Sequence, residues 1–380
     1  MNKERNINQE VLKPIVKKIL NIKQTEDINI NSWEIKKFKV GTVGEVYIVE
    51  GDCICSVNDA EKKVNWDVVL KIQKKWDRIG DPESWKREFL MYHNNVFKQL
   101  PNNFNVPNCY EMKIENNEVW LWLENIKGIT NKDISIEDYE MIAKNIGEYQ
   151  GILNRDKDTM RYPWMSSRYW YAITLVNWCT DGILWLDDEL NNEDKRKLDL
   201  RTIESLYSIW NNRDELLDIM NNLPKTLCHR DFHPANIFIT KKSEKVSNIT
   251  LIDWDCVGIG VLGEDIADLL GETLTYFDYD IEKASDLMDI IFSNYMAGLR
   301  EVNCNVEEDV VRLGYTMCFV MHWGFRVYFQ LKCAKEAKIK ERYIRILNFV
   351  SQKTKSLNEL VEKFNAQVHK NRKIEGKQHV

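Results

Sequence analysis

The segment 229–236, His-Arg-Asp-Phe-His-Pro-Ala-Asn, concentrates side chains that can move protons, bind metals and form hydrogen bonds. Asp231 and Asn236 lie five positions apart, on a predicted loop between two apolar runs. A carboxylate there can accept a proton from an attacking hydroxyl or orient it, and an amide oxygen can bind Mg²⁺ without adding charge. We therefore predict Asp231 as a general base or orienting group and Asn236 as a metal ligand.

A further carboxylate follows in the next apolar run, "ITLIDWD", where Asp253 stands at the predicted end of a strand. Oxygen donors suit Mg²⁺, which keeps water and phosphate oxygens as its remaining ligands. An aspartate in a turn is common, but the ordered set of Asp231, Asn236 and Asp253 matches what phosphoryl transfer from a nucleotide requires. Asp253 is predicted to be the main metal ligand.

Phosphoryl transfer also needs a cation and a cover for the phosphates, and candidates for both lie upstream. Lys71 stands in the apolar run "VVLKI", and an inward-facing lysine needs a partner, for which Glu88 in the following helical run is the candidate. Gly41, Thr42 and Gly44 form a turn that lets the backbone approach phosphates. The alternatives are an ordinary hairpin for the glycines and a solvated helix position for Glu88.

The first third of the chain is predicted to form a small antiparallel sheet with an inserted helix. β-branched and aromatic residues dominate five runs, which glycines or polar residues separate. The strands are predicted over 33–40, 45–57, 66–72, 109–115 and 118–125, with breaks at Gly41, Gly44, Gly51 and 58–63, a turn at Asn116-Asn117, and helices over 8–24 and 82–100.

Beyond Gly128 the pattern is mainly helical, apart from a predicted hairpin formed by 236–240 and 248–254. This order predicts an α+β fold with two lobes. The predicted parts are a nucleotide-binding lobe over 1–124, a hinge near 123–128, a helical lobe over 128–370 with the catalytic loop 229–236 and the acceptor site, late helices over 282–302, 306–333 and 336–367, and a flexible tail over 371–380.

Two motifs, "HRDFHPANIF" and "ITLIDWDCVGIGVLGEDIADLL", resemble the aminoglycoside phosphotransferase and choline kinase superfamily. These small-molecule kinases share the two-lobed protein kinase-like fold. The resemblance covers about residues 33–350 and implies a small antiparallel-sheet N-terminal lobe, a larger mainly helical C-terminal lobe, and ATP or GTP with Mg²⁺ as cofactors. It implies Asp231 as the catalytic aspartate, Asn236 and Asp253 as metal ligands, and Asp265 as support for the catalytic loop.

The resemblance also places Leu123, Glu124 and Asn125 at the hinge, where backbone groups bind the adenine. This chain departs from the family pattern at two points. Tyr149-Gln150 stands where many relatives have a histidine, and the glycine turn matches only approximately. Both departures concern nucleotide details rather than the transfer chemistry.

A protein kinase is a poorer match than a small-molecule kinase. Asp253 is followed by Trp254-Asp255 instead of Phe-Gly, and Asp265 comes twelve residues after Asp253. That segment is too short to hold a peptide-docking activation segment. The expected acceptor is therefore a small molecule.

Acceptor binding is predicted from aromatic and acidic residues of the helical lobe. The stretch 181–220 holds eleven Asp or Glu against five Lys or Arg, and such a stretch is either a wall for a cationic substrate or a solvated face. Tryptophans and a lone histidine on apolar helices are alternatively core residues. The candidates are Trp178, Trp185, Trp254, Asp255, His322 and Trp323.

The two histidines of the catalytic loop are expected to support it. His229 is expected to pack beneath the loop and bond to backbone, and His233 to tie the loop down beside the stiff Pro234. Zinc is not expected, because no second and third ligand stand at a suitable spacing.

The composition of the chain argues against several other classes of protein. The charge of 53 − 59 = −6 offers no basic field for nucleic acid, and no run of 18 apolar residues predicts a membrane span. The polar N-terminus and nine scattered cysteines predict a cytoplasmic protein with reduced thiols.

Together these observations predict a phosphotransferase that moves the γ-phosphate of ATP or GTP to a hydroxyl of a small, cationic acceptor, such as an aminoglycoside or another antibiotic. The alternatives are a metabolic kinase for choline, ethanolamine or a sugar, and a nucleotide-binding pseudokinase scaffold. The oligomeric state is left open.

Overall fold

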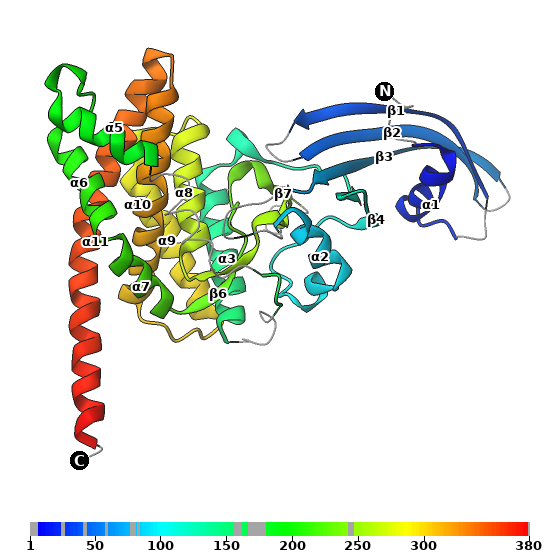
Figure 1. Ribbon diagram of the computed structural model, residues 1–380. Coiled ribbons are helices and arrows are strands. Elements are labelled where there is room, and N and C mark those ends of the chain that lie inside the picture. The colour runs from blue at the N-terminus through cyan, green and yellow to red at the C-terminus, as the bar shows by residue number, and fades with distance from the viewer. Residues whose placement is uncertain are drawn as a thin grey trace.

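The computed structural model describes residues 7–23, 27–40, 44–57, 60–76, 81, 84–155, 162–165, 180–241 and 247–378 of the 380-residue chain. A curved antiparallel sheet forms one part of the molecule and a bundle of helices forms the other (Figure 1). The predicted α+β fold with a sheet lobe and a mainly helical lobe is confirmed. Within the described parts of the chain, no helix combines the length and the apolar character needed to cross a bilayer.

The sheet lobe contains five strands in the order β1-β2-β3-β5-β4, and all neighbouring pairs are antiparallel. Asn116 and Asn117 have φ of 52° and 60°, which is the geometry of the two-residue turn predicted between the last two strands. The strands are β1 (Ile28–Val40), β2 (Gly44–Val57), β3 (Ala60–Lys74), β4 (Cys109–Glu115) and β5 (Glu118–Leu123).

Gly51 lies inside β2, although the sequence pattern predicted a break there. It stands between Trp33 of β1 and Trp66 of β3 in the register of the sheet. A Cβ atom at Gly51 would lie 2.3 Å from the oxygen of Ser32 and 2.8 Å from the Trp66 ring. The glycine therefore makes room for a tryptophan and does not end the strand.

Helix α1 (Gln9–Ile19) covers one face of the sheet and is shorter than the predicted helix over 8–24. The side chain of Asn8 accepts a hydrogen bond from the backbone N–H of Val11 and caps the helix. Leu12, Ile15 and Val16 are fully buried in a cluster with residues of the sheet. The apolar stripe of α1 therefore docks this helix onto the lobe.

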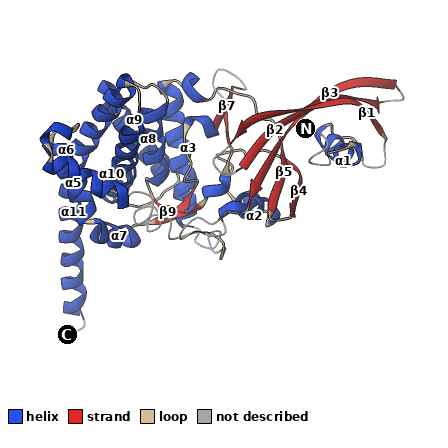
Figure 2. Ribbon diagram, turned by 45° about the horizontal axis from the view of Figure 1, so that its top comes forward, coloured by secondary structure: helices blue, strands red, loops and turns tan. Residues whose placement is uncertain are grey.

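Helix α2 (Arg87–His93) is the inserted helix, and it is flanked by two 3₁₀ turns over 84–86 and 96–99. The helical segment is thus shorter than the predicted 82–100. Arg87 and Glu88 at its start are buried. Figure 2 shows α2 beside the sheet, on the side of the helical lobe.

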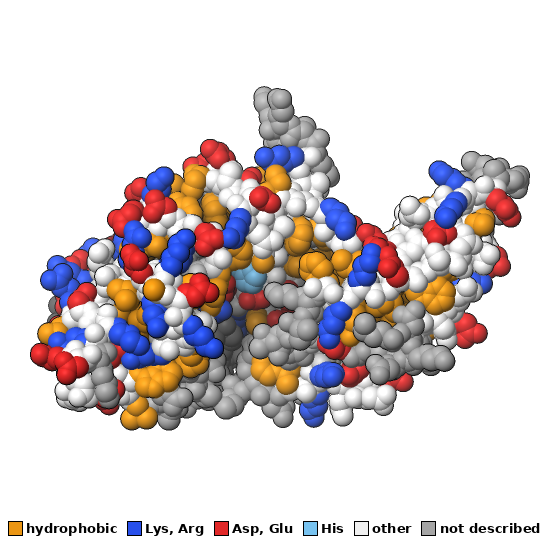
Figure 3. Space-filling view, turned by 90° about the horizontal axis from the view of Figure 1, so that it is seen from above, with side chains coloured by type: hydrophobic (Ala, Val, Ile, Leu, Met, Phe, Trp, Pro, Cys, Tyr) orange, Lys and Arg blue, Asp and Glu red, His pale blue; other side chains and the backbone are white. Residues whose placement is uncertain are grey.

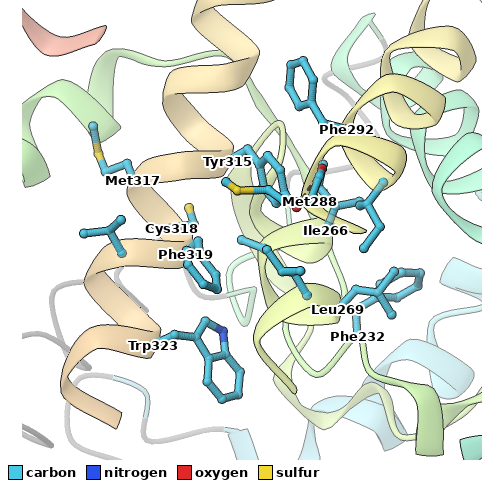
Figure 4. Packing of buried hydrophobic residues seen from close by; sticks show 14 of the residues in the cluster. Phe232, Ile266, Leu269, Met288, Phe292, Tyr315, Met317, Cys318, Phe319 and Trp323 are labelled. Atoms are coloured by element: carbon cyan, nitrogen blue, oxygen red, sulfur yellow. Dashed lines mark hydrogen bonds between the residues drawn. The ribbon is translucent and has the colours of Figure 1, made fainter. Parts of the chain in front are cut away.

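The helical lobe is built around a core in which α8, α9 and α10 pack against each other (Figure 4). The last helix continues to Gln378, so residues 371–378, which we expected to form a flexible tail, are helical. The helices are α3 (Ile136–Arg155), α5 (Thr180–Asn191), α6 (Leu200–Asn211), α7 (Arg213–Asn222), α8 (Glu264–Tyr276), α9 (Ala284–Glu301), α10 (Glu308–Cys333) and α11 (Ala337–Gln378).

Two small strand pairs position the loops between the lobes. β7 (Ile237–Lys241) and β8 (Ser247–Leu251) form the predicted antiparallel hairpin. β6 (Lys225–Cys228) pairs with β9 (Gly258–Val261), a pairing that the sequence pattern did not predict because both strands are four residues long. The loop 229–236 therefore leaves one pair and enters the other.

The acidic stretch 181–220 falls on α5, on α6, on most of α7 and on the segment between α5 and α6. Helices α5 and α6 lie at the end of the helical lobe away from the sheet (Figures 1 and 2). Its described carboxylates are exposed, with the exception of Glu189, which is buried and paired with Lys332. The arrangement agrees with the solvated-face interpretation and not with a substrate wall.

Candidate active site

The loop 229–236 and the segment after β8 are held together by backbone hydrogen bonds. The N–H of Ile252 donates to the carbonyl of Asn236 at 3.1 Å. His229 lies beneath the loop, with its Nε2 3.1 Å from the carbonyl oxygen of Ile252. Burial lowers the pKa of His229 to about 4, so the ring is neutral and Nε2 carries the donated proton. The structure thus gives His229 the packing that we expected.

Asp231 and Asn236 are in direct contact. The amide nitrogen Nδ2 of Asn236 donates to Oδ2 of Asp231 at 2.8 Å and to its backbone carbonyl at 3.0 Å. The amide oxygen, which is the atom that can bind a metal, is therefore left at the other end of the group. Asp231 keeps a third of its side chain, 34%, exposed and is accessible to a substrate.

His233 lies against the other oxygen of Asp231. Its Nε2 is 3.4 Å from Oδ1 of Asp231, and its Nδ1 accepts a hydrogen bond from the N–H of Ala235. Nε2 is therefore the ring nitrogen that faces the carboxylate. Burial alone would raise the pKa of Asp231, but His233 and Asn236 hold that pKa below its ordinary value. Asp231 is ionised at neutral pH.

Asp265, in the first turn of α8, binds the backbone of the loop 229–236. Its Oδ2 accepts from the N–H of His229 at 2.9 Å and its Oδ1 from the N–H of Arg230 at 2.8 Å. Arg230 has a φ of 65°, a left-handed conformation that is uncommon for a residue with a side chain. Burial raises the pKa of Asp265 to about 7. The two N–H groups fix the turn that presents Asp231.

Arg230 forms a buried ion pair that the sequence analysis did not include. Its Nε donates to Oε1 of Glu264 at 2.7 Å, and both side chains are almost fully buried. Glu264 also accepts from the N–H of Val261 at 3.1 Å. The signal was present in the sequence, since Arg230 directly precedes Asp231 and Glu264 directly precedes Asp265.

Gln150 of α3 is a second residue that the sequence analysis missed as part of the site. Its Nε2 donates to Oδ2 of Asp265 at 2.8 Å, and its Oε1 accepts from the hydroxyl of Tyr295 at 2.6 Å. Gln150 is fully buried. Its amide links the carboxylate of Asp265 to the phenol of Tyr295.

Lys71 of β3 contacts two carboxylates. Its Nζ is 2.6 Å from Oε2 of Glu88 and 2.5 Å from Oδ1 of Asp253. Burial lowers the pKa of Lys71, but the carboxylates outweigh this effect and raise that pKa well above its ordinary value. The predicted pair of Lys71 and Glu88 is formed, and Asp253 is added to it.

We expected Trp254 to line an acceptor pocket, but its side chain is buried in the core. It is 1% exposed, its ring packs edge-on against His229 at 4.6 Å and Phe97 at 5.3 Å, and its Nε1 donates to the carbonyl of Leu251. Asp253, just before it, has a left-handed φ of 67°. That turn points the carboxylate of Asp253 toward Lys71 and the indole of Trp254 into the core.

Asp255 faces the sheet lobe instead of an outer pocket. Its Oδ2 accepts from Nε2 of Gln73 at 3.3 Å. Burial, reinforced by the nearby carboxylate of Asp253, raises the pKa of Asp255 to about 7. The candidate is therefore placed between the lobes, close to Lys71.

Arg87 is the third residue that the sequence analysis missed. It is fully buried, and its guanidinium contacts three different segments. Nη1 donates to the backbone carbonyl of Asp255 at 3.0 Å, Nε to the carbonyl of Trp164 at 3.3 Å, and Nη2 pairs with Asp81. Arg87 thereby fixes the start of α2, with Glu88, to the turn that carries Asp253.

The predicted hinge follows β5, which ends at Leu123. Oε2 of Glu124 accepts from Nδ2 of Asn108 at 2.7 Å, and Nδ2 of Asn125 donates to Asp67 at 2.9 Å. The side chains of both hinge residues are thus bonded to the sheet lobe.

The predicted phosphate cover is described only in part. Gly44 begins β2 opposite Gln73. A Cβ atom at Gly44 would lie 2.6 Å from the carbonyl oxygen of Ile72, so a side chain there would clash with the backbone of β3. Gly41 and Thr42 lie outside the described residues.

Of the remaining acceptor candidates, Trp178 lies outside the described residues. Trp185 packs against Phe329 of α10, with 5.7 Å between ring centroids. His322 and Trp323 are buried in α10. Figure 3 shows a hollow in the surface between the helical lobe and the sheet, with acidic side chains near it.

The sequence of this chain matches a known protein family. The sequence model of the phosphotransferase enzyme family, APH, matches residues 66–300 of the 380 residues. The chain belongs to this family. The match confirms the predicted resemblance, and it includes Lys71, the loop 229–236 and Asp253. It also supports a small-molecule kinase activity at the level of the family.

Several solved structures are similar to this family member at low sequence identity. Ethanolamine kinase of Plasmodium vivax is 14% identical over 90% of this chain and 89% of that chain, with a TM-score of 0.47. A GDP complex of aminoglycoside 2'-phosphotransferase-IIIa is 13% identical over 86% of this chain and 94% of that chain, with a TM-score of 0.49. An amicoumacin kinase with AMP-PNP and Ca²⁺ is 16% identical over 93% of this chain and 97% of that chain, with a TM-score of 0.47. A search of curated protein sequences finds no match.

Proposed function

We propose that the protein transfers the γ-phosphate of ATP or GTP to a hydroxyl group of a small molecule. The observation that carries this proposal is the contact of Lys71 with both Glu88 and Asp253, beside the contact of Asp231 with Asn236. These groups come from separate segments of the chain. A scaffold without phosphoryl transfer has no physical need for all of them, which argues against the pseudokinase alternative.

Asp231 is proposed to orient the acceptor hydroxyl and accept its proton. The carboxylate is ionised and partly exposed, and Asn236 and His233 fix both of its oxygens. A fixed, ionised carboxylate suits a transition state in which positioning provides most of the rate enhancement. Lys71 is proposed to bind the phosphates, with Glu88 holding its ammonium group in place.

Mg²⁺ is proposed to be held by Asn236 and Asp253. The amide oxygen of Asn236 is turned away from Asp231, and the carboxylate of Asp253 is 37% exposed. Two oxygen donors at the mouth of a phosphate site fit this cation, which prefers few protein ligands together with phosphates and water. When bound, Mg²⁺ neutralises phosphate charge.

The sheet lobe, residues 1–124, is proposed to bind the nucleotide, and residues 128–370 to bind the acceptor. The backbone at Leu123, Glu124 and Asn125 is the proposed binding site for the base, and the turn with Gly41, Thr42 and Gly44 the proposed phosphate cover. This arrangement places the transfer between the lobes. A cytoplasmic location, where ATP, GTP and Mg²⁺ are available, is part of the proposal.

A cationic acceptor, such as an aminoglycoside or another antibiotic, is the proposed substrate class. Support comes from a carboxylate that lies near the catalytic loop. Asp268 of α8 accepts from the N–H of Phe232 at 3.0 Å. This group, rather than the exposed acids of 181–220, is proposed to bind an amine of the acceptor.

The decisive experiment measures ADP and GDP release with Mg²⁺ against a panel of aminoglycosides, other hydroxylated antibiotics, choline, ethanolamine and sugars. We expect acceptor-dependent release by the wild-type protein and none by Asp231→Ala, with nucleotide binding by calorimetry retained in both. Comparable turnover by Asp231→Ala would remove Asp231 from its role. Nucleotide binding without release across the panel would favour the pseudokinase scaffold.

A further inference from the structure

Arg326 of α10 occupies a site that has the composition of a binding site for an organic cation. Its guanidinium carbon lies 4.7 Å from the ring centroid of Trp323 and 5.6 Å from that of Tyr276. Its Nη2 is 2.9 Å from Oε1 of Glu272. Two aromatic rings and a carboxylate are the groups with which proteins bind ammonium ligands. Here the chain itself supplies the cation.

This cation box, formed by Tyr276, Trp323 and Glu272, lies beside the catalytic loop. Asp268, one turn before Glu272 on α8, accepts from the N–H of Phe232, the residue after the catalytic aspartate. The ring of Phe277, next to Tyr276, lies 6.3 Å from that of His233. A ligand held at the box would therefore lie close to the catalytic loop.

The floor of the box is fixed by close packing between α8 and α10. Trp323 is 1% exposed and projects from α10 toward α8 (Figure 4). A Cβ atom at Gly271 of α8 would lie 2.1 Å from the Trp323 ring, so only glycine leaves room for the indole. Trp323 therefore cannot turn aside to make the box larger.

Arg326 fills the box and is itself partly exposed. Its side chain is 35% exposed, whereas that of Glu272 is 9% exposed. Its Nη1 lies 3.1 Å from Nε2 of His322, one turn earlier on α10. The guanidinium is thus held by the box on one side and faces outward on the other, where its remaining N–H groups can donate to oxygen atoms.

We propose that Arg326 determines acceptor specificity by filling the cation box from within the chain. Quaternary ammonium groups are excluded from this position, and the acceptor presents hydroxyl or other oxygen atoms to the guanidinium. The proposal rests on the proposed function and sharpens it. An acceptor whose only recognition group is a choline-like headgroup in the cation box is excluded. A hydroxylated ring whose amines bind outside the cation box is accepted.

The test measures binding of tetramethylammonium by calorimetry, without nucleotide, to the wild-type protein and to Arg326→Ala. We expect at least about tenfold tighter binding by the variant, because removal of the guanidinium opens the box. Arg326→Gln, which keeps more of the side-chain volume, is the second variant in case Arg326→Ala fails to fold. Equal binding by wild-type protein and a folded variant overturns the proposal.

Arg312→Ala is the matched control. Arg312 also lies on α10, stacks over Phe292 at 3.9 Å and pairs with Glu308. It should gain no tetramethylammonium binding, and a gain equal to that of Arg326→Ala would show that the effect does not come from the box.

A second arm adds Glu272→Gln to Arg326→Ala. The double variant should lose most of the gained affinity, and a full gain without the carboxylate would contradict the assignment of the box. Because this measurement requires no turnover, its result is independent of the ADP-release screen. A screen without turnover would overturn the proposed function, whereas unchanged tetramethylammonium binding would overturn the role of Arg326.

Discussion

Lys71 on β3 and Asp253 after β8 are 182 positions apart in the chain, and their side chains are 2.5 Å apart. The contact joins the sheet lobe to the turn that follows the hairpin of the helical lobe. It places an ammonium group and a candidate metal ligand at one point of the cleft. The phosphates of a nucleotide would bind at the same point, because they need both groups.

Lys71→Met should reduce the rate of acceptor-dependent ADP release by about 10²–10³-fold, since one preorganised charge at the phosphates is lost. The measurement is kcat/KM for the nucleotide in the coupled assay. Lys74→Met, on the exposed end of the same strand, is the control and should retain activity. A rate for Lys71→Met close to that of the control would contradict the proposed phosphate role.

Arg87→Lys should raise KM for the magnesium nucleotide by about 10–100-fold, because a lysine cannot contact Asp81, Asp255 and Trp164 together. The charge toward the buried Asp81 is kept, so the change in unfolding free energy should be smaller than that for Arg87→Met. Nucleotide affinity by calorimetry with and without Mg²⁺ is the measurement. A loss of stability without a change in KM would assign Arg87 a structural role alone.

Gln150→Leu should lower the free energy of unfolding by about 1–3 kcal/mol, because it leaves Asp265 and the hydroxyl of Tyr295 without their shared partner. Denaturant unfolding measures the effect. Gln367→Leu, at an exposed site of α11, is the control. Equal stability of the two variants would show that the network around Asp265 does not depend on Gln150.

His229 should make the protein less stable in acid. Its pKa is lowered by burial from 6.5 to about 4, so between these values the unfolded chain binds a proton that the folded protein does not. Stability is therefore present above pH 6.5 and is lost as the pH falls toward 4, by up to about 3 kcal/mol for this group.

His229→Gln tests this pH dependence, because glutamine keeps a donor for the carbonyl of Ile252 but does not titrate. Unfolding free energies between pH 4 and pH 7 should fall less steeply for this variant than for the wild-type protein. His93→Gln, at an exposed position of α2, should leave the slope unchanged. Parallel slopes for wild-type protein and His229→Gln would refute the assignment.

The parts of the fold that the sequence predicted are those with strong local signals. Runs of β-branched and aromatic residues predicted the strands, and the Asn116-Asn117 turn has the left-handed backbone that such a pair favours. The spacing of Asp231, Asn236 and Asp253 placed these residues on two adjacent loops. The predicted break at Gly51 was wrong. A glycine in a strand pattern usually indicates a break, and the sequence does not show that the ring of Trp66 packs against this position.

The residues that were missed depend on contacts between distant segments. Arg87 and Gln150 sit in ordinary helical runs, and nothing local indicates that each is buried against several partners. Trp254 shows the opposite error, since its position beside Asp253 suggested a ligand pocket. A left-handed residue at Asp253 turns the next side chain inward, and the sequence alone does not reveal that conformation.

Three contacts from the sheet lobe meet at the single turn 253–255: those of Lys71, Gln73 and Arg87. An incoming phosphate competes for Lys71 alone. The contacts of Gln73 and Arg87 go to Asp255 and not to Asp253, so they tie this turn to the sheet lobe without using the ammonium group of Lys71.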